Sequence, residues 1–111
     1  METPAMSGSR TIIAVEDRLA NPHAGDVLRE DFLVGGDIAV ADVSKATGLS
    51  THRLAALLTG TVAVDADADL RLTRYFGVTE GFFLRLQNAY DLEEAWCAHG
   101  EEFERIPRRA A

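Results

Sequence analysis

Apolar side chains recur at the spacing of an α-helix through most of this chain, and the clearest repeat lies in residues 39–60. Gly48 divides this stretch, and a glycine can take the positive φ that ends a helix. Ser50 can cap a second helix, because its hydroxyl can accept a bond from a free amide of the next turn. The pattern predicts two short helices joined by a tight turn, the helix-turn-helix of many DNA-binding proteins. The positions expected to face inward are Val43, Ala46, Leu49, Leu54, Leu57 and Leu58.

Three further helices are predicted around this motif. One precedes it, over residues 26–33, and ends at a pair of glycines. The other two begin at Asp65 and Thr79, whose side chains can cap a helix. The last helix is the longest, because its apolar period continues past Gly100 to about Phe103. The expected fold class is therefore all-α, with five helices and an extended C-terminal helix.

One acidic residue falls among the predicted core positions. Asp69 lies at helical spacing from the apolar side chains of the helix that begins at Asp65. An unpaired carboxylate at the edge of a core is costly. We therefore expect Asp69 to be partly exposed or paired, with Arg53 or Arg74 as its partner.

The two ends of the chain hold few core candidates. Residues 1–22 are expected to form a largely disordered arm, in which the β-branched run 11–15 is a candidate short strand. The helix-turn-helix domain is predicted over residues 23–96, and residues 97–111 are expected to be the end of the last helix and a tail. The candidate strand and the end of the last helix are competing candidates for a dimer interface.

Charge complicates the assignment to DNA binding. The chain has 111 residues, which suits one domain, and a formal net charge of −7 at pH 7. An acidic balance opposes DNA binding, since phosphate contacts require cations. Residues 37–64, however, hold Lys45 and Arg53 against Asp37 and Asp42. The acids elsewhere either meet a basic partner or simply keep the protein soluble.

Several classes of protein are disfavoured by what the sequence lacks. No apolar run is long enough to span a bilayer, and no signal peptide is evident. Cys97 is the single cysteine, so a cytoplasmic location is predicted. Cys97 and His99 lack the second ligand pair of a closed zinc site, and helix capping explains the alternating acids at positions 65, 67 and 69 better than calcium binding. We predict neither an enzyme nor a bound metal or cofactor.

Three stretches of the chain resemble the HigA-type antitoxins, members of the phage-repressor-like (XRE/Cro) helix-turn-helix family. They are HAGDVLREDFL, ATGLSTHRLAALLTG and LRLTRYFGVTEGFFLRLQNAYDLEEA, which lie in this order within residues 23–95. The resemblance implies a five-helix, lambda-repressor-like fold and a homodimer that binds double-stranded operator DNA in its own promoter. It also implies an antitoxin of a type II toxin–antitoxin system, which autoregulates its operon and neutralises a RelE-like (HigB-type) ribonuclease toxin.

The DNA-contacting positions of that family can be carried over to this chain. The resemblance places Thr51 and His52 at base edges in the major groove, where both can hydrogen-bond. Ala56 lies one turn further on and offers an apolar contact. The remaining expected contacts reach phosphates or the groove wall and come from Lys45, Ser50, Arg53, Thr59 and Thr61.

Alternatives stay open at two of these positions. His52 is either a base contact or a solvated surface histidine, and Arg53 either contacts DNA or forms a salt bridge with Asp69 or a neighbouring helix. Ala39 and Val40 replace the Ser-Gln pair with which many relatives begin the first motif helix. The alternative functions are therefore a stand-alone helix-turn-helix regulator, or a protein-interaction antitoxin whose motif binds DNA weakly or not at all.

Overall fold

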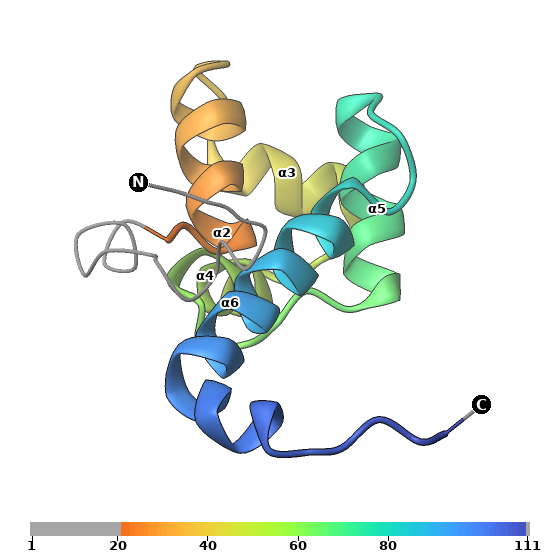
Figure 1. Ribbon diagram of the computed structural model, residues 1–111. Helices are drawn as coiled ribbons and strands as arrows, with labels where there is room; N and C mark the ends of the chain where they lie inside the picture. Colours follow the sequence, from red (N-terminus) through yellow and green to blue (C-terminus); the bar gives the residue numbers. More distant parts are fainter. Residues whose placement is uncertain (1–20, 111) are drawn as a thin grey trace. The chain divides into compact units, whose positions relative to one another are not determined.

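The computed structural model describes residues 21–110, and this part of the chain is almost entirely helical (Figure 1). Because η2 is a π-helical continuation of α2, the two form the first predicted helix. The all-α class, the five helices and the long C-terminal helix are confirmed. Residues 1–20 of the expected arm, which include the candidate strand at residues 11–15, lie outside the described residues. The elements are α2 (Ala24–Val27), η2 (Leu28–Val34), α3 (Val40–Thr47), α4 (Thr51–Thr59), α5 (Ala66–Phe76) and α6 (Phe82–Glu104).

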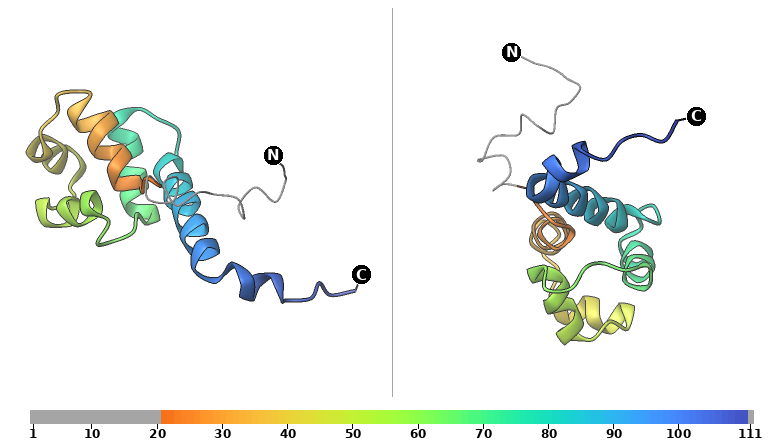
Figure 2. Two further views of the ribbon diagram at one scale, coloured as in Figure 1. Left: turned by 60° about the vertical axis from the view of Figure 1, so that its left-hand side comes forward. Right: turned by 60° about the horizontal axis from the view of Figure 1, so that its bottom comes forward.

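The described residues fall into two compact units. One is the unit of residues 22–90, which contains the whole helix-turn-helix. A single core holds this unit together, and α3 and α4 meet in it as two short helices inclined to each other (Figure 2). Its buried apolar residues are Ala24, Leu28, Leu33, Val43, Leu49, Leu54, Leu57, Leu58, Val64, Ala68, Leu72 and Phe83.

The turn of the motif is formed by the residues that the sequence indicated. Gly48 ends α3 with φ 83°, in the left-handed region. Ser50 Oγ accepts a hydrogen bond from the backbone N of Arg53 at 3.0 Å and so caps α4. Leu49, between the two helices, is buried in the core. These caps satisfy amides and carbonyls that every helix end leaves free.

The buried face of α3 differs from the prediction in one residue. Val43 is buried, but Ala46 is exposed, so its predicted place in the core is wrong. Thr47, four residues after Val43, takes the inward position. Its hydroxyl donates to the carbonyl of Val43 at 2.7 Å and accepts from the backbone N of Leu49 at 3.2 Å, so burial leaves no polar atom of this side chain unsatisfied.

The first helix begins two residues earlier than predicted, because His23 caps it. The Nδ1 atom of His23 accepts hydrogen bonds from the backbone N atoms of Gly25 at 2.9 Å and Asp26 at 3.3 Å. In return, Asp26 accepts from the backbone N of His23 at 3.1 Å, which completes a capping box. Histidine is not among the usual capping residues, so the sequence did not reveal this start.

The same helix ends just before the predicted glycine pair, but neither glycine takes the left-handed conformation that would end it. The last helical residue is Val34, and Gly35 keeps a right-handed φ of −61°. The left-handed residue of this turn is Asp37, with φ 54°. Asp and Asn adopt this region more readily than other non-glycine residues, so the chain turns here without a glycine.

The first turn of α6 is capped from another helix. Asp69, on α5, is only 1% exposed. Its carboxylate accepts hydrogen bonds from the backbone N atoms of Gly81 at 2.7 Å, Phe83 at 2.9 Å and Leu84 at 3.1 Å. The cost of burying the charge is therefore offset by three amides and by the positive end of the α6 dipole.

Two predictions fail at this junction. Asp69 is buried and bonded to backbone amides, whereas the sequence indicated partial exposure or pairing with Arg53 or Arg74. Thr79 does not cap α6 with its side chain; its carbonyl accepts from the backbone N of Phe82 at 3.0 Å, while Asp69 takes the capping role. The reason is packing, because α5 places the Asp69 carboxylate against the amides that a local capping side chain would otherwise bind.

The second unit, among the described residues, consists of Asn21 and residues 91–110. Its helical part belongs to α6, which runs to Glu104 with a break in helical geometry at His99 (φ −134°, ψ 19°). The rings of Trp96 and Phe103 lie on either side of the break with centroids 5.5 Å apart. The prediction that this helix continues past Gly100 is confirmed.

Candidate nucleic-acid interface

The outer face of α4 is the candidate DNA-reading surface. Its inner face is closed by three buried leucines. Thr51 and His52 lie exposed in the first turn, and Ala56 is partly buried one turn further on. Within the described part of the chain, the side chains of Thr51 and His52 have no hydrogen-bond partner. A short helix with free polar groups at its N-terminal end is the form in which such motifs meet base edges in the major groove.

The hydroxyls at the two ends of α4 differ in availability. Ser50 uses its oxygen as an acceptor in the cap, which leaves its proton free to donate. Thr59 Oγ1 lies 3.1 Å from the carbonyl of Ala55 and 2.9 Å from Thr61 Oγ1. If Thr59 donates to that carbonyl, Thr61 must donate to Thr59, so a phosphate would have to displace this internal pair. Lys45 is exposed in the last turn of α3.

Arg53 is held by carboxylates of the next helix. Its Nη2 atom lies 2.9 and 3.1 Å from the two carboxylate oxygens of Asp65, and its Nη1 atom lies 3.0 Å from Oδ2 of Asp67. Of the two alternatives for this residue, the structure therefore contains the salt bridge. The acids are Asp65 and Asp67 rather than Asp69.

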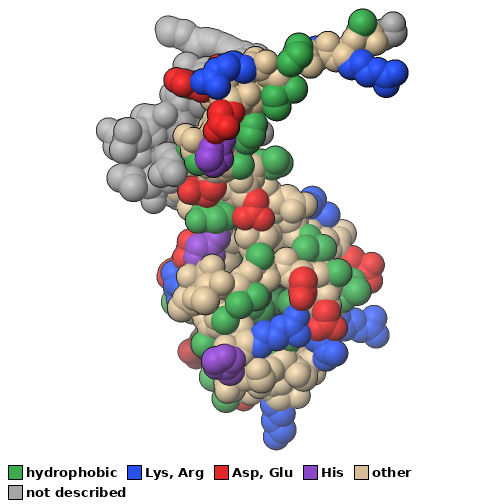
Figure 3. Space-filling model, turned by 90° about the horizontal axis from the view of Figure 1, so that it is seen from below, with side chains coloured by type: hydrophobic (Ala, Val, Ile, Leu, Met, Phe, Trp, Pro, Cys, Tyr) green, Lys and Arg blue, Asp and Glu red, His purple; other side chains and the backbone are tan. Residues whose placement is uncertain are grey.

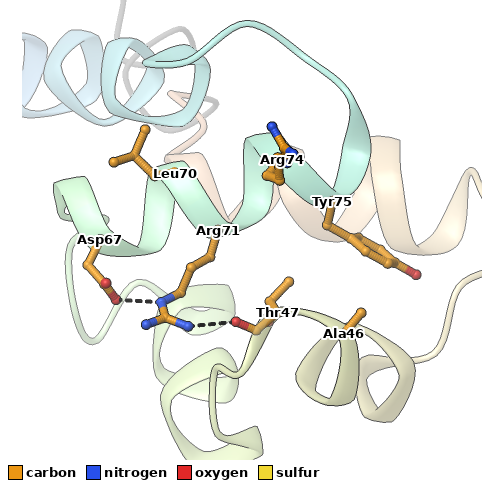
Figure 4. Close-up of a pocket in the computed structure, with 7 residues that line it drawn as sticks. All are labelled: Ala46, Thr47, Asp67, Leu70, Arg71, Arg74 and Tyr75. Carbon is orange, nitrogen blue, oxygen red and sulfur yellow. Dashed lines mark hydrogen bonds and ion pairs between the residues drawn. The ribbon is translucent and has the colours of Figure 1, made fainter.

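The salt bridge continues to the end of α3. Asp67 Oδ2 also accepts from Nε of Arg71 at 3.0 Å, and Nη1 of Arg71 donates to the carbonyl of Thr47 at 2.8 Å (Figure 4). We call Arg53, Asp65, Asp67 and Arg71 the interhelical ion network. The two arginines, Arg71 more than Arg53, hold the pKa of the Asp67 carboxyl below its ordinary value.

Asp67 should make the stability of this unit depend on pH. Because its pKa is lowered in the folded state, its contribution is present above the unfolded pKa of about 3.9 and is lost as the pH falls through the folded pKa. We expect Asp67→Asn to lower the free energy of unfolding at neutral pH and to lose this disadvantage in acid. Denaturant titrations of both proteins over a pH series measure it; a constant difference at every pH would contradict the assignment.

A hollow of about 370 Å³ lies beside this network, between α3 and α5. Arg71 lies between Asp67 and Thr47, while Arg74 points away from the network (Figure 4). Leu70 and Tyr75 add apolar surface that is partly exposed. Around the hollow, as over the face drawn in Figure 3, basic side chains lie beside acidic ones. The residues that line it are Ala46, Thr47, Asp67, Leu70, Arg71, Arg74 and Tyr75.

Sequence reasoning missed Arg71 and the role of the two acids. The Asp67–Arg71 pair was readable, because residues four apart share a helix face. The Arg53 pairs were not, because the partners come from different helices.

Residues 21–110 hold no group of three side chains that could bind a metal ion; Cys97 instead lies 3.7 Å from Glu93, and His99 lies 2.9 Å from Glu102. None of the helices described could cross a membrane.

Comparison with known proteins places these features among antitoxins. The chain matches no protein-family model. It is 33% identical over 85 residues to virulence-associated protein I of Dichelobacter nodosus, across 77% of this chain and 79% of that protein. Antitoxin HigA of Pseudomonas aeruginosa, solved with the higBA promoter, is 30% identical with a TM-score of 0.73, over 82% of this chain and 99% of that chain. A HigA-family addiction module antidote protein of Coxiella burnetii is 31% identical with a TM-score of 0.73, over 81% and 98%.

Proposed function

This chain belongs to the HigA family of antitoxins, and on that premise we propose that it binds operator DNA through α4 and represses its own operon. The observation that carries the proposal is the exposed first turn of α4, where Thr51 and His52 have no partner among the described residues. A related antitoxin, the HigA of P. aeruginosa, was solved with promoter DNA. The same fold over 82% of this chain supports the same use of α4.

The chemistry of the outer face of α4 suits base reading. The hydroxyl of Thr51 can donate or accept, and its methyl group can contact a thymine methyl. His52 can present a donor or an acceptor according to its tautomer. Lys45 and the free proton of Ser50 would hold phosphates on either side of the groove. In a homodimer, each α4 would read one half-site of a pseudo-palindromic operator.

As an antitoxin, the protein would also neutralise a toxin, and we propose a RelE-like (HigB-type) ribonuclease as that partner. The acidic balance of the chain supports this, because a ribonuclease needs a basic surface to hold RNA. A basic, ribonuclease-like reading frame beside the gene, and co-purification of its product with this chain, would test the assignment. Purification of each protein alone from a co-expressing cell would contradict it.

One observation favours a second candidate, in which the protein acts by protein contact and its motif binds DNA weakly. Ala39, at the cap of α3, makes no side-chain hydrogen bond, and Arg53 is already paired with two acids. Both features reduce the phosphate-holding groups of the motif. A wild-type protein that binds its promoter no better than unrelated DNA at low salt would establish this candidate instead.

Replacing Thr51 and His52 together by alanine tests the proposed reading surface. Two lost base contacts at about 1 kcal/mol each should weaken operator binding about thirtyfold and leave non-specific binding nearly unchanged. Fluorescence anisotropy with promoter DNA and with a scrambled duplex, at one salt concentration, measures both. Asn88→Ala, an exposed position on α6, is the matched control. Unchanged operator affinity in the double variant would contradict base reading by these residues.

A further inference from the structure

We propose that Arg53 is a positioning residue for operator reading, which sets the orientation of α4 through Asp65 and Asp67, and is not itself a phosphate contact. The inference rests on the proposed function, because it assigns Arg53 a role in operator reading. It replaces the direct DNA contact that the family resemblance implies for this position.

Arg53 is bound to a carboxylate that is itself held in place. Oδ1 of Asp65 accepts from the backbone N of Ala68 at 2.9 Å, which caps α5, and from Nη2 of Arg53 at 2.9 Å. A capping side chain is held by the backbone of its own helix. The guanidinium, two residues after Thr51, therefore ties the first turn of α4 to the N-terminus of α5.

The same network extends to α3, the other helix of the motif. Arg71 bridges Asp67 to the carbonyl of Thr47, the last residue of α3. The approach is close, because a Cβ added at Gly48 would lie 2.8 Å from Nη1 of Arg71. The network thus joins the end of α3, the start of α4 and the start of α5, the three points that define how the reading helix is presented.

The local balance of charge also favours a paired Arg53. Side chains of Asp65 and Asp67 are 64% and 51% exposed, close to the turn that begins α4. If Arg53 moved to a phosphate, the two carboxylates would keep only Arg71 and would face the phosphate with excess negative charge. While Arg53 stays in place, two cations balance two acids. A paired Arg53 thus removes a repulsion as well as fixing a geometry.

A fork-shaped guanidinium is needed for this role. Arg53 contacts Asp65 through Nη2 and Asp67 through Nη1, which a single ammonium group cannot do with the same geometry. A phosphate, in contrast, accepts a lysine as a point charge almost as well as an arginine. Arg53→Lys therefore separates the two roles, because it keeps the charge and loses the bridge.

The test compares operator with scrambled DNA for wild-type protein, Arg53→Lys, Arg53→Ala and the pair Asp65→Asn with Asp67→Asn. Asparagine at position 65 preserves the cap of α5, since Asn and Asp cap equally well. Arg74→Ala is the matched control, because Arg74 lies on α5, as Asp67 does, and pairs with no carboxylate among residues 21–110. Thermal unfolding confirms that each variant is folded at the assay temperature.

For a positioning residue, the ratio of operator to non-specific affinity should fall about fivefold in Arg53→Lys, in Arg53→Ala and in the asparagine pair, and Arg74→Ala should keep the wild-type ratio. Combining Arg53→Ala with the asparagine pair should add no further loss, since each change breaks the same bridge. The dependence of log affinity on log salt should keep its wild-type slope in Arg53→Ala.

Two different results would overturn the positioning role. One is a wild-type ratio in Arg53→Lys together with a salt slope reduced by about one in Arg53→Ala, the signature of a phosphate contact. The other is a higher operator affinity in the asparagine pair with no fall in the ratio of operator to non-specific affinity, as if Arg53 had been released to bind DNA. Failure of the proposed function itself looks different, because the wild-type protein would then show no preference for the operator.

Discussion

Replacing Asp69 by alanine is expected to lower the free energy of unfolding by about 3 kcal/mol, enough to threaten a small domain. The carboxylate is buried and accepts from three backbone amides at the start of α6. Alanine would leave these amides without their acceptor in a site that water reaches poorly. Hydrogen bonds to a charged group are among the stronger ones in proteins, so the loss should exceed that of an ordinary cap.

Two further variants make this result interpretable. Asp69→Asn keeps one acceptor oxygen and should fall between wild type and Asp69→Ala. Glu80→Ala, an exposed acid near the same helix start, should change stability by less than about 0.5 kcal/mol. Urea unfolding followed by circular dichroism measures all three. Equal stability of the Asp69→Ala and Glu80→Ala proteins would show that α6 does not depend on the buried carboxylate.

The second large effect is expected at Gly25, where alanine should cost about 3 kcal/mol, the upper end of the usual range for overpacking. A Cβ at this position would lie 2.1 Å from the carbonyl oxygen of Leu57 and 2.8 Å from that of Leu58. Both atoms are backbone at the end of α4, so no side chain can swing aside. Either α2 or α4 would have to move.

Gly77 supplies the contrasting control. It ends α5 with φ 73°, and a Cβ there would meet nothing within 4 Å. Alanine at Gly77 should therefore cost only the strain of a left-handed residue, about 1 kcal/mol. Thermal or urea unfolding of the two variants compares the free-energy cost of a close backbone approach, at Gly25, with that of a left-handed backbone conformation, at Gly77. If Gly77→Ala proved the more destabilising, α2 and α4 would not be packed as closely as the Gly25 geometry requires.

The packing of the first helix against α4 bears on the proposed DNA reading as well as on stability. Arg29 of η2 donates to the carbonyl of Leu58 at 3.1 Å, so the C-terminal end of α4 is held by the first helix. Its N-terminal end is held by the interhelical ion network. Both ends of α4 are therefore fixed by side chains from outside the motif, which is what the proposed reading of base edges requires.

Much of the fold could be predicted from local patterns. The apolar period placed the helices, and Gly48, Ser50 and Asp65 marked ends whose caps form within a few residues. Such signals survive in the sequence because the partners are covalently close, so their geometry is nearly independent of the rest of the chain. His23 is the local exception, because its ring nitrogen acts as a cap that residue preferences do not anticipate.

The helix-turn-helix and the exposure of Thr51 and His52 were thus already contained in the order of residues, since helical periodicity turns these positions away from the leucines. The surroundings of the charged residues were settled instead by the packing of the helices. Asp69 bonds to amides 12 to 15 positions away, and Arg53 pairs with acids 12 and 14 positions away. For Asp69 and Arg53, burial and pairing depend on which helix packs beside them, and no local pattern carries that information.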